Sequence, residues 1–214
     1  MKKCCIVGGG NFCADVFRYD ENSLIIAADA GYKFLTEIGI TPHIVVGDFD
    51  SLGYTPDHPE TEVHPPVKDD TDMMLAVEKG IELGCDEFYI YGATGGRIAH
   101  TLGNLQVLKF IAEKGLSGYI FDSDTVITAV QNSSLVFDEN ASGYISLLPF
   151  GSESAGVTLK GLKYELDACN LPCDRPLGIS NEFTGKSAKI TVYSGAVVAV
   201  WENTCILPER EVLP

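Results

Sequence analysis

The sequence has no apolar run long enough to cross a membrane. None of its stretches approaches the roughly 18 uncharged apolar residues of a membrane-spanning helix. The first apolar run, from Cys4 to Val7, stops at Gly8, before the apolar centre of a signal peptide could form. We therefore expect a soluble, non-secreted protein in the cytoplasm.

Basic residues are scarce. The chain has 15 Lys and Arg against 30 Asp and Glu, which gives a formal net charge of −15. Because this charge would repel a nucleic-acid backbone, we do not expect a nucleic-acid partner. An anionic ligand such as a nucleotide would need a locally basic or metal-neutralised pocket, for which Lys68 and Arg97 are the candidates in the motif region described below.

A disulfide framework and a zinc site are also missing. The seven cysteines are odd in number and scattered, which suits a reducing compartment such as the cytosol. Cys169 and Cys173 lie four residues apart, but no second Cys/His pair stands near them to complete four zinc ligands. We interpret the cysteines as small buried or surface thiols.

Three familiar ligand-binding motifs do not fit the sequence. A dinucleotide-binding GxGxxG motif starting at Gly8 would need glycine at Cys13, and a P-loop ending in the late Gly-Lys-Ser tripeptide would need glycine at Ser180. An EF-hand starting at Asp48 has Pro59 where its last oxygen ligand should stand. A phosphate or metal site must therefore be built in another way.

The first half of the chain alternates short apolar runs with helical patterns, which predicts a parallel sheet with crossover helices. The predicted strands are 4–7, 24–28, 44–46, 88–91 and 119–121. The predicted helices are 32–38, a helix with the apolar stripe Met74, Val77 and Ile81 that ends near Gly84, and 100–114. We predict a doubly wound, mainly parallel α/β domain over residues 1–127.

The second half loses the helical periodicity and shows short strand-like runs between turn residues. These runs are 135–137, 144–148, 157–159, 188–192 and 196–201. The pattern predicts an antiparallel sheet or a small β-sandwich, which we assign to residues 128–214. No Pro/Gly-rich linker separates the halves, so we expect them to pack tightly.

Glycine- and aspartate-rich segments follow four of the predicted strands. They are Gly8–Asn11, Asp29–Gly31, Gly47–Ser51 and Gly92–Arg97. Each is compatible with an ordinary turn, but parallel strands end at one edge of a sheet, where α/β proteins bind their ligands. The sequence therefore predicts a ligand site at this edge.

Aspartates in this region suit Mg²⁺. If Asp48, Asp50 and Asp72 lie within ~4 Å of one another, each pair repels by about 4 kcal/mol at an effective dielectric constant near 20, and a divalent cation would offset that repulsion. The Asp69–Asp72 segment also suits the start of a helix, with Asp70 or Thr71 as its cap. The segment therefore favours a metal site, a helix start, or both.

Arg97 follows three glycines and stands just before a predicted helix. Its guanidinium group and the neighbouring backbone N–H groups could bind a phosphate together. His100 suits either a general base or an ordinary hydrogen-bonding residue. In the second half, Gly178–Phe183 places polar groups beside an aromatic residue, which is also compatible with a plain turn.

Taken in order, these motifs resemble the thiamine pyrophosphokinase (thiamine diphosphokinase) family over nearly the whole chain. They are Asp29-Ala30-Gly31, GDFDS at 47–51, DDTD at 69–72, GGR at 95–97 with His100, and Ser180-Asn181-Glu182. The resemblance implies an N-terminal α/β domain, a C-terminal β-sandwich, and a homodimer that binds thiamine between the domains of two subunits. It also implies ATP as co-substrate and Mg²⁺ as cofactor.

The resemblance implies a role for each matching position. Asp48, Asp50 and Asp72 hold Mg²⁺ and, together with Arg97, form the catalytic set. Ser180 and Asn181 contact thiamine. The implied ATP and phosphate contacts are Asp29, Lys68, Thr94, Gly95, Gly96, Arg97, His100 and Asn104. The implied reaction moves the terminal diphosphate of ATP to the hydroxyethyl oxygen of thiamine and releases AMP, with an unassigned aspartate as proton acceptor.

One position departs from the family pattern. The family usually reads Gly-Gly-Arg-x-Asp-His, whereas Ala99 replaces the aspartate here. The sequence is also compatible with two alternatives to the kinase, and Ala99 favours the first of them. One is a regulatory module that binds thiamine or a nucleotide without turnover, and the other is a Mg²⁺-dependent phosphohydrolase that uses water as the acceptor.

Overall fold

The computed structural model describes residues 1–65, 69–151, 155–202 and 206–213. The chain folds into two compact units. Unit 1 contains residues 1–107 and 116–123, and unit 2 contains residues 108–115 and 124–214. Lys68, one of the predicted phosphate contacts, lies outside the described residues.

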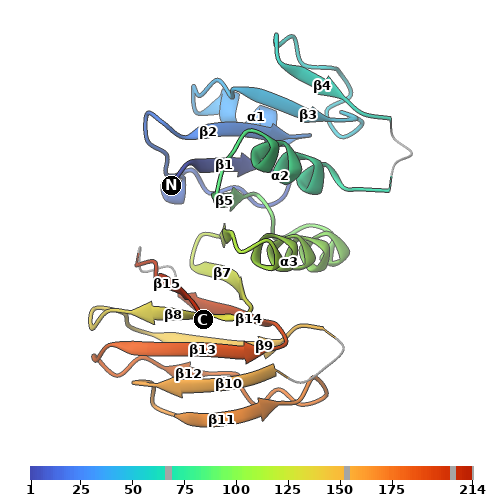
Figure 1. The fold of residues 1–214 in the computed structure, drawn as a ribbon. Helices are drawn as coiled ribbons and strands as arrows, with labels where there is room; N and C mark the ends of the chain where they lie inside the picture. Colours follow the sequence, from blue (N-terminus) through green and yellow to red (C-terminus); the bar gives the residue numbers. More distant parts are fainter. Residues whose placement is uncertain (66–68, 152–154, 203–205, 214) are drawn as a thin grey trace. The chain divides into compact units, whose positions relative to one another are not determined.

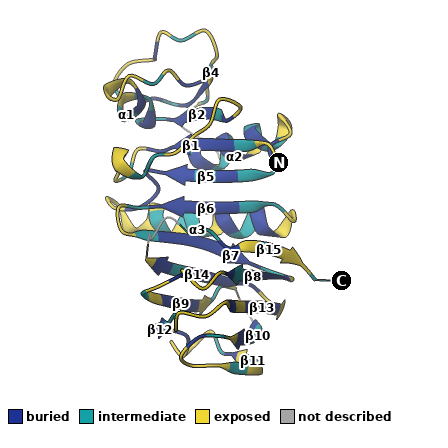
Figure 2. Cartoon of the chain, turned by 90° about the vertical axis from the view of Figure 1, so that its left-hand side faces the viewer, coloured by how far each residue is buried: buried dark blue, intermediate teal, exposed yellow. Residues whose placement is uncertain are grey.

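Unit 1 is built on a parallel sheet with the strand order β6-β5-β1-β2-β3-β4. Figure 1 labels β1 to β5 of this sheet, and Figure 2 labels β6 beside β5. The strands are β1 (Lys3–Val7), β2 (Leu24–Ala28), β3 (Ile44–Gly47), β4 (Thr61–Val63), β5 (Glu87–Tyr91) and β6 (Ser117–Phe121). Five of them match the predicted strands. The short β4 was missed because its three residues lack an apolar run.

The helices of unit 1 lie between these strands in the chain. They are the short 3₁₀ helix η1 (Ala14–Val16), α1 (Gly31–Glu37), α2 (Asp72–Glu82) and α3 (Ile98–Glu113), whose last turns belong to unit 2. Helix α2 begins where Thr71 accepts a hydrogen bond from the Met74 N–H group at 3.3 Å. This bond confirms one of the two caps that the sequence allowed.

Helix α2 packs through a face one residue away from the predicted stripe. Met74 and Ile81 are only half-buried, whereas the buried residues are Met73, Ala76, Val77 and Gly80. The small residues explain the shift, because a Cβ atom at Gly80 would stand 2.7 Å from Phe88 and 3.0 Å from the Cys4 sulfur. The helix therefore approaches the sheet on its small side chains.

The sheet is buried along its central strands, as the dark blue of β1, β2 and β5 in Figure 2 shows. Cys4 and Phe88 meet α2, and the alternate residues of β5 and β6 join an aromatic cluster. This cluster consists of Phe12, Phe17, Tyr19, Phe34, Tyr89, Tyr91, Tyr119 and Phe121. Burial of both faces explains why the strands read as continuous apolar runs.

Unit 2 contains two antiparallel sheets. The first has the order β12-β9-β14-β7, and the second has the order β11-β10-β13-β8-β15. The strands are β7 (Thr125–Val130), β8 (Ser133–Phe137), β9 (Tyr144–Pro149), β10 (Ala155–Lys160), β11 (Leu166–Leu171), β12 (Asn181–Glu182), β13 (Ala188–Ser194), β14 (Val197–Glu202) and β15 (Glu209–Val212).

The sequence predicted five of these nine strands. Three of the missed strands, β11, β12 and β15, stand at sheet edges, where a strand needs few apolar residues to be paired. The fourth, β7, lies in the segment that the sequence offered as a domain boundary. Phe137 of β8 and Trp201 of β14 are both buried, and their rings meet edge-on with centroids 5.4 Å apart, which joins the two sheets.

Among the helices of the described ranges, none has the length and apolarity that a membrane span requires.

Candidate active site

A cavity of about 650 Å³ lies in unit 1 at the carboxyl ends of its parallel strands. Its lining comes from the loops that follow β1, β2, β3 and β5 and from the first turns of α2 and α3. The structure therefore gathers all four polar segments that the sequence placed at this edge. The volume falls in the usual range of small-molecule pockets, roughly 300–1,000 Å³.

Backbone hydrogen bonds join two glycine-rich loops that line this cavity. The Gly10 N–H group donates to the Gly92 carbonyl at 2.8 Å, and the Asn11 N–H group donates to the Thr94 carbonyl at 2.8 Å. A Cβ atom at Gly10 would stand 2.4 Å from the Thr94 carbonyl oxygen. Glycine is therefore required at position 10 by the close approach of two backbones.

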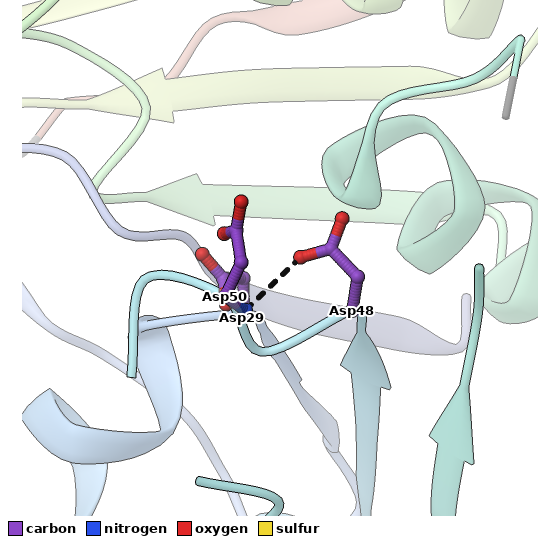
Figure 3. A group of neighbouring side chains, drawn as sticks. All are labelled: Asp29, Asp48 and Asp50. Carbon is purple, nitrogen blue, oxygen red and sulfur yellow. Dashed lines mark hydrogen bonds between the residues drawn. The ribbon is translucent and has the colours of Figure 1, made fainter. Parts of the chain in front are cut away.

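Three carboxylates form the most highly charged part of the cavity (Figure 3). Oxygen atoms of Asp29, Asp48 and Asp50 all lie within 4.8 Å of one another. The Asp50 N–H group donates to Asp48 Oδ1 at 3.2 Å, which fixes the turn after β3. Asp29 and Phe49 have positive φ angles of 48° and 60°, so both turns hold the unfavourable left-handed conformation.

This cluster has the properties of a cation site. At a separation of no more than 4.8 Å, each pair of carboxylates repels by about 3.5 kcal/mol or more at an effective dielectric constant near 20. Asp29 Oδ1 is buried and has no hydrogen-bond partner among the described residues. A buried acceptor in this state is costly unless a cation or a donor reaches it. An all-oxygen ligand set is also the one that Mg²⁺ prefers.

The structure groups the predicted metal ligands differently from the sequence. Asp48 and Asp50 come together as expected, but the third member of the close cluster is Asp29 and not Asp72. Asp72 is the first residue of α2 and lines the same cavity. Asp29, which the resemblance implied as an ATP or phosphate contact, therefore lies close to Asp48 and Asp50 in the carboxylate cluster.

The loop after β5 is held by side chains that the sequence assigned to the ligand. Asn104 Nδ2 donates to the Ala93 carbonyl at 2.7 Å. The hydroxyl group of Thr94, which is 8% exposed, donates to Asp122 Oδ2 at 2.5 Å. Sequence reasoning missed Asp122, although one signal could have found it: an acidic residue directly after a strand that ends at the same sheet edge.

The remaining predicted phosphate contacts stand at the mouth of the cavity. Arg97 and His100 are exposed and line it at the start of α3, and Ala99 lines it between them. Gly95 and Gly96 precede them with φ angles of 75° and 57°, a backbone conformation that glycine adopts without strain. A guanidinium group, the glycine-rich loop and the carboxylate cluster therefore line the same cavity.

The predicted thiamine contacts belong to unit 2. Asn181 is 5% exposed, and its side-chain amide accepts from the Tyr164 N–H group at 2.9 Å and donates to the Tyr164 carbonyl at 2.8 Å. Its Oδ1 also accepts from the Glu182 N–H group at 2.9 Å. Ser180 is exposed, with a φ angle of 58°. Of the two, Ser180 is the side chain that faces solvent.

Replacing Asn181 with alanine should destabilise the protein. The change removes three hydrogen bonds, two with Tyr164 and one with Glu182, and each such bond contributes about 0.5–1.5 kcal/mol. We expect the free energy of unfolding, measured by urea denaturation, to fall by about 2–4 kcal/mol. Ser180→Ala is the matched control and should change it by less than about 0.5 kcal/mol. Equal stability of the two variants would contradict this structural role for Asn181.

Comparison with known proteins identifies the family. Residues 18–120 match the model of the thiamin pyrophosphokinase catalytic domain, and residues 133–197 match that of the thiamin pyrophosphokinase vitamin B1 binding domain. The chain is 33% identical over 211 residues to thiamine pyrophosphokinase of Bacillus subtilis (strain 168), covering 94% of this chain and 98% of the relative.

Solved structures agree with the sequence comparison. The crystal structure of thiamine pyrophosphokinase from Bacillus subtilis aligns with a TM-score of 0.83 at 30% identity, covering 95% of this chain and all of the other. That of thiamin pyrophosphokinase from Geobacillus thermodenitrificans aligns with a TM-score of 0.78 at 29% identity, covering 95% and 99%. Two family models, a relative that is matched over 98% of its length and a shared fold all support the same assignment. This chain therefore belongs to the thiamine pyrophosphokinase family.

Proposed function

We propose that the chain is a thiamine diphosphokinase, which transfers diphosphate from ATP to the hydroxyethyl group of thiamine and releases AMP. Family membership supports this activity over a regulatory module or a phosphohydrolase. One structural observation carries the catalytic part of the proposal. It is the cluster of Asp29, Asp48 and Asp50 in a cavity at the carboxyl ends of the parallel strands.

Mg²⁺ is the proposed cofactor. Asp48 and Asp50 would hold it as the sequence predicted, together with Asp29, whose buried Oδ1 atom lacks a hydrogen-bond partner among the described residues. We keep Asp72 in the proposed set because it lines the same cavity. A bound Mg²⁺ ion would neutralise phosphate charge and so favour attack on phosphorus.

ATP phosphates would lie between the aspartates and the loop after β5. Arg97 would bind phosphate oxygens through its guanidinium group, and the N–H groups of Gly95 and Gly96 would add neutral donors. His100 stands beside Arg97 and is the further candidate for a phosphate contact. Lys68 keeps its proposed role from sequence alone.

The proposed reaction needs little covalent chemistry from the protein. The hydroxyethyl oxygen of thiamine attacks the β-phosphorus of ATP and forms a new P–O bond. The bond from the β-phosphorus to the bridging oxygen of the α-phosphate breaks, and AMP leaves with that electron pair. An aspartate of the cavity accepts the hydroxyl proton, and catalysis rests mainly on positioning and charge neutralisation.

We further propose the family's arrangement for the whole molecule. Residues 1–127 would form a doubly wound catalytic domain, which the burial of the central strands supports. Residues 128–214 would form a β-sandwich, which the Phe137–Trp201 contact between the two sheets supports. A homodimer would bring Ser180 and Asn181 to the thiamine of the partner subunit, with Ser180 making the side-chain contact because the Asn181 amide is already bonded.

A cytoplasmic location completes the proposal. Among the described cysteines, Cys4, Cys5, Cys13, Cys85 and Cys169 are free thiols. Burial raises the pKa of Cys5 to about 12, so this thiol stays protonated and unreactive at neutral pH. Thiols in this state suit a reducing compartment.

Product analysis tests the proposed activity. Purified protein with ATP and Mg²⁺ should release AMP only when thiamine is present, and chromatography should show thiamine diphosphate in an equal amount. Thiamine binding without any product would instead indicate the regulatory module. Phosphate release that does not depend on thiamine would indicate the phosphohydrolase.

A further inference from the structure

We propose that Asp122 is a positioning residue for the nucleotide, which acts by fixing the loop Gly92–Arg97 through the hydroxyl group of Thr94. The proposal rests on the proposed function, because this loop is the one assigned to the ATP phosphates. Asp122 itself does not line the cavity formed by the described residues, so its influence passes through Thr94.

Neighbouring strands set the position of Asp122. Strands β5 and β6 pair in parallel with Tyr91 opposite Phe121, so the two loops that follow begin at the same level of the sheet. Asp122 comes directly after Phe121, and its Oδ1 atom accepts from the Ser123 N–H group at 2.7 Å. The same carboxylate presents Oδ2 to Thr94. Asp122 is therefore anchored on one oxygen and holds the loop with the other.

Several contacts hold the loop after β5, and they differ in strength. The Gly10 and Asn11 N–H groups bind the Gly92 and Thr94 carbonyls, Asn104 binds the Ala93 carbonyl, and the Thr94 hydroxyl group binds Asp122. The last of these joins a hydroxyl group to a carboxylate, whereas the others join neutral groups. Charge-assisted bonds are shorter and about twice as strong as neutral ones. The contact of Asp122 should therefore contribute most to the order of the loop.

The direction of this bond also limits what Thr94 can do. A carboxylate only accepts hydrogen bonds, so the single hydroxyl proton of Thr94 is committed to Asp122. Thr94 lines the cavity and can offer a ligand only its oxygen lone pairs. Phosphate oxygens are acceptors, which leaves their binding to the other proposed donors, among them Arg97 and the backbone N–H groups. Thr94 thus holds the loop Gly92–Arg97 in place and does not donate a hydrogen bond to phosphate.

The substitution Asp122→Ala tests the proposal in the full-length protein. We expect the KM for ATP to rise about tenfold, as for the loss of a charge-assisted hydrogen bond. The KM for thiamine should change less than about twofold, because the loop does not carry that substrate. Asp124→Ala is the matched control, since it removes the same charge two residues later from an exposed side chain whose bond goes to Thr125.

Variants of Thr94 separate positioning from general destabilisation. Thr94→Ser keeps the hydroxyl group and should retain an ATP KM near that of the wild type, whereas Thr94→Val should match Asp122→Ala. The double variant Thr94→Val/Asp122→Ala should show no further increase in the KM for ATP, because both changes break one contact. Additive effects, or an equal rise in the KM for both substrates, would overturn the proposal.

Hydrogen exchange gives a readout that does not depend on activity. In the protein alone, amides of residues 92–97 should exchange faster in Asp122→Ala than in Asp124→Ala, while those of β1 stay protected. Unchanged exchange in the loop would overturn the proposed anchoring even in an active enzyme. Faster exchange together with a wild-type protein that makes no thiamine diphosphate would instead place the failure in the proposed function.

Discussion

Replacing Asp50 with asparagine is expected to lower the turnover number by about a hundredfold or more, the usual cost of removing one electrostatic group from an active site. Asp50 belongs to the cluster whose oxygens lie within 4.8 Å of one another, and the amide removes its charge while keeping its shape. The concentration of Mg²⁺ needed for half-maximal rate should rise as well, because a ligand is lost.

Unlike the turnover number, the stability of Asp50→Asn should not fall. Asp50 is exposed, and the variant relieves repulsion from Asp29 and Asp48, so the free energy of unfolding without Mg²⁺ should stay within about 0.5 kcal/mol or rise. Asp57→Asn is the control, since Asp57 is an exposed aspartate that does not line the cavity, and it should keep wild-type kinetics. Near-wild-type turnover in purified Asp50→Asn would contradict the metal site.

Replacing Gly10 with alanine is expected to damage both stability and nucleotide binding. The new Cβ atom would stand 2.4 Å from the Thr94 carbonyl oxygen and 2.7 Å from the Gly92 carbonyl oxygen. Both contacts are with backbone, so the two glycine-rich loops must separate and lose their hydrogen bonds. We expect the free energy of unfolding, measured by urea denaturation, to fall by about 1–3 kcal/mol. The KM for ATP should rise about tenfold or more.

Gly103 provides the contrast within the same cavity. A Cβ atom at this helical position meets nothing within 4 Å. Gly103→Ala should therefore raise the free energy of unfolding by up to about 1 kcal/mol, the difference in helix propensity between the two residues. An equal free energy of unfolding for Gly10→Ala and Gly103→Ala would contradict the close approach of the two glycine-rich loops.

The sequence predicted the site region well because one physical rule located it. Parallel strands end at one edge, so segments as far apart as Gly8–Asn11 and Gly92–Arg97 could be placed together without a structure. Apolar runs also located the central strands, because these strands are buried on both faces. Edge strands such as β15 were not predicted, because an edge strand can pair with its neighbour without an apolar pattern in its sequence.

Side-chain partners were the part that the sequence could not supply. Asp29 lies in the close cluster because its own φ angle is positive. The spacing of residues in the sequence does not predict that backbone conformation. Thr94 and Asn181 were assigned to ligands, yet both are buried and bonded to the protein itself. Asp122 is 28 residues from Thr94 in the sequence, so their contact depends on the register of β5 and β6.

Isotope tracing tests the central claim most directly. With ATP labelled at the β-phosphorus, Mg²⁺ and thiamine, we predict that the label appears in thiamine diphosphate. With ATP labelled at the α-phosphorus, we predict that the label appears in AMP, in an amount equal to the diphosphate product. β-Label recovered in ADP or in free phosphate, with none in thiamine diphosphate, would contradict diphosphate transfer by this protein.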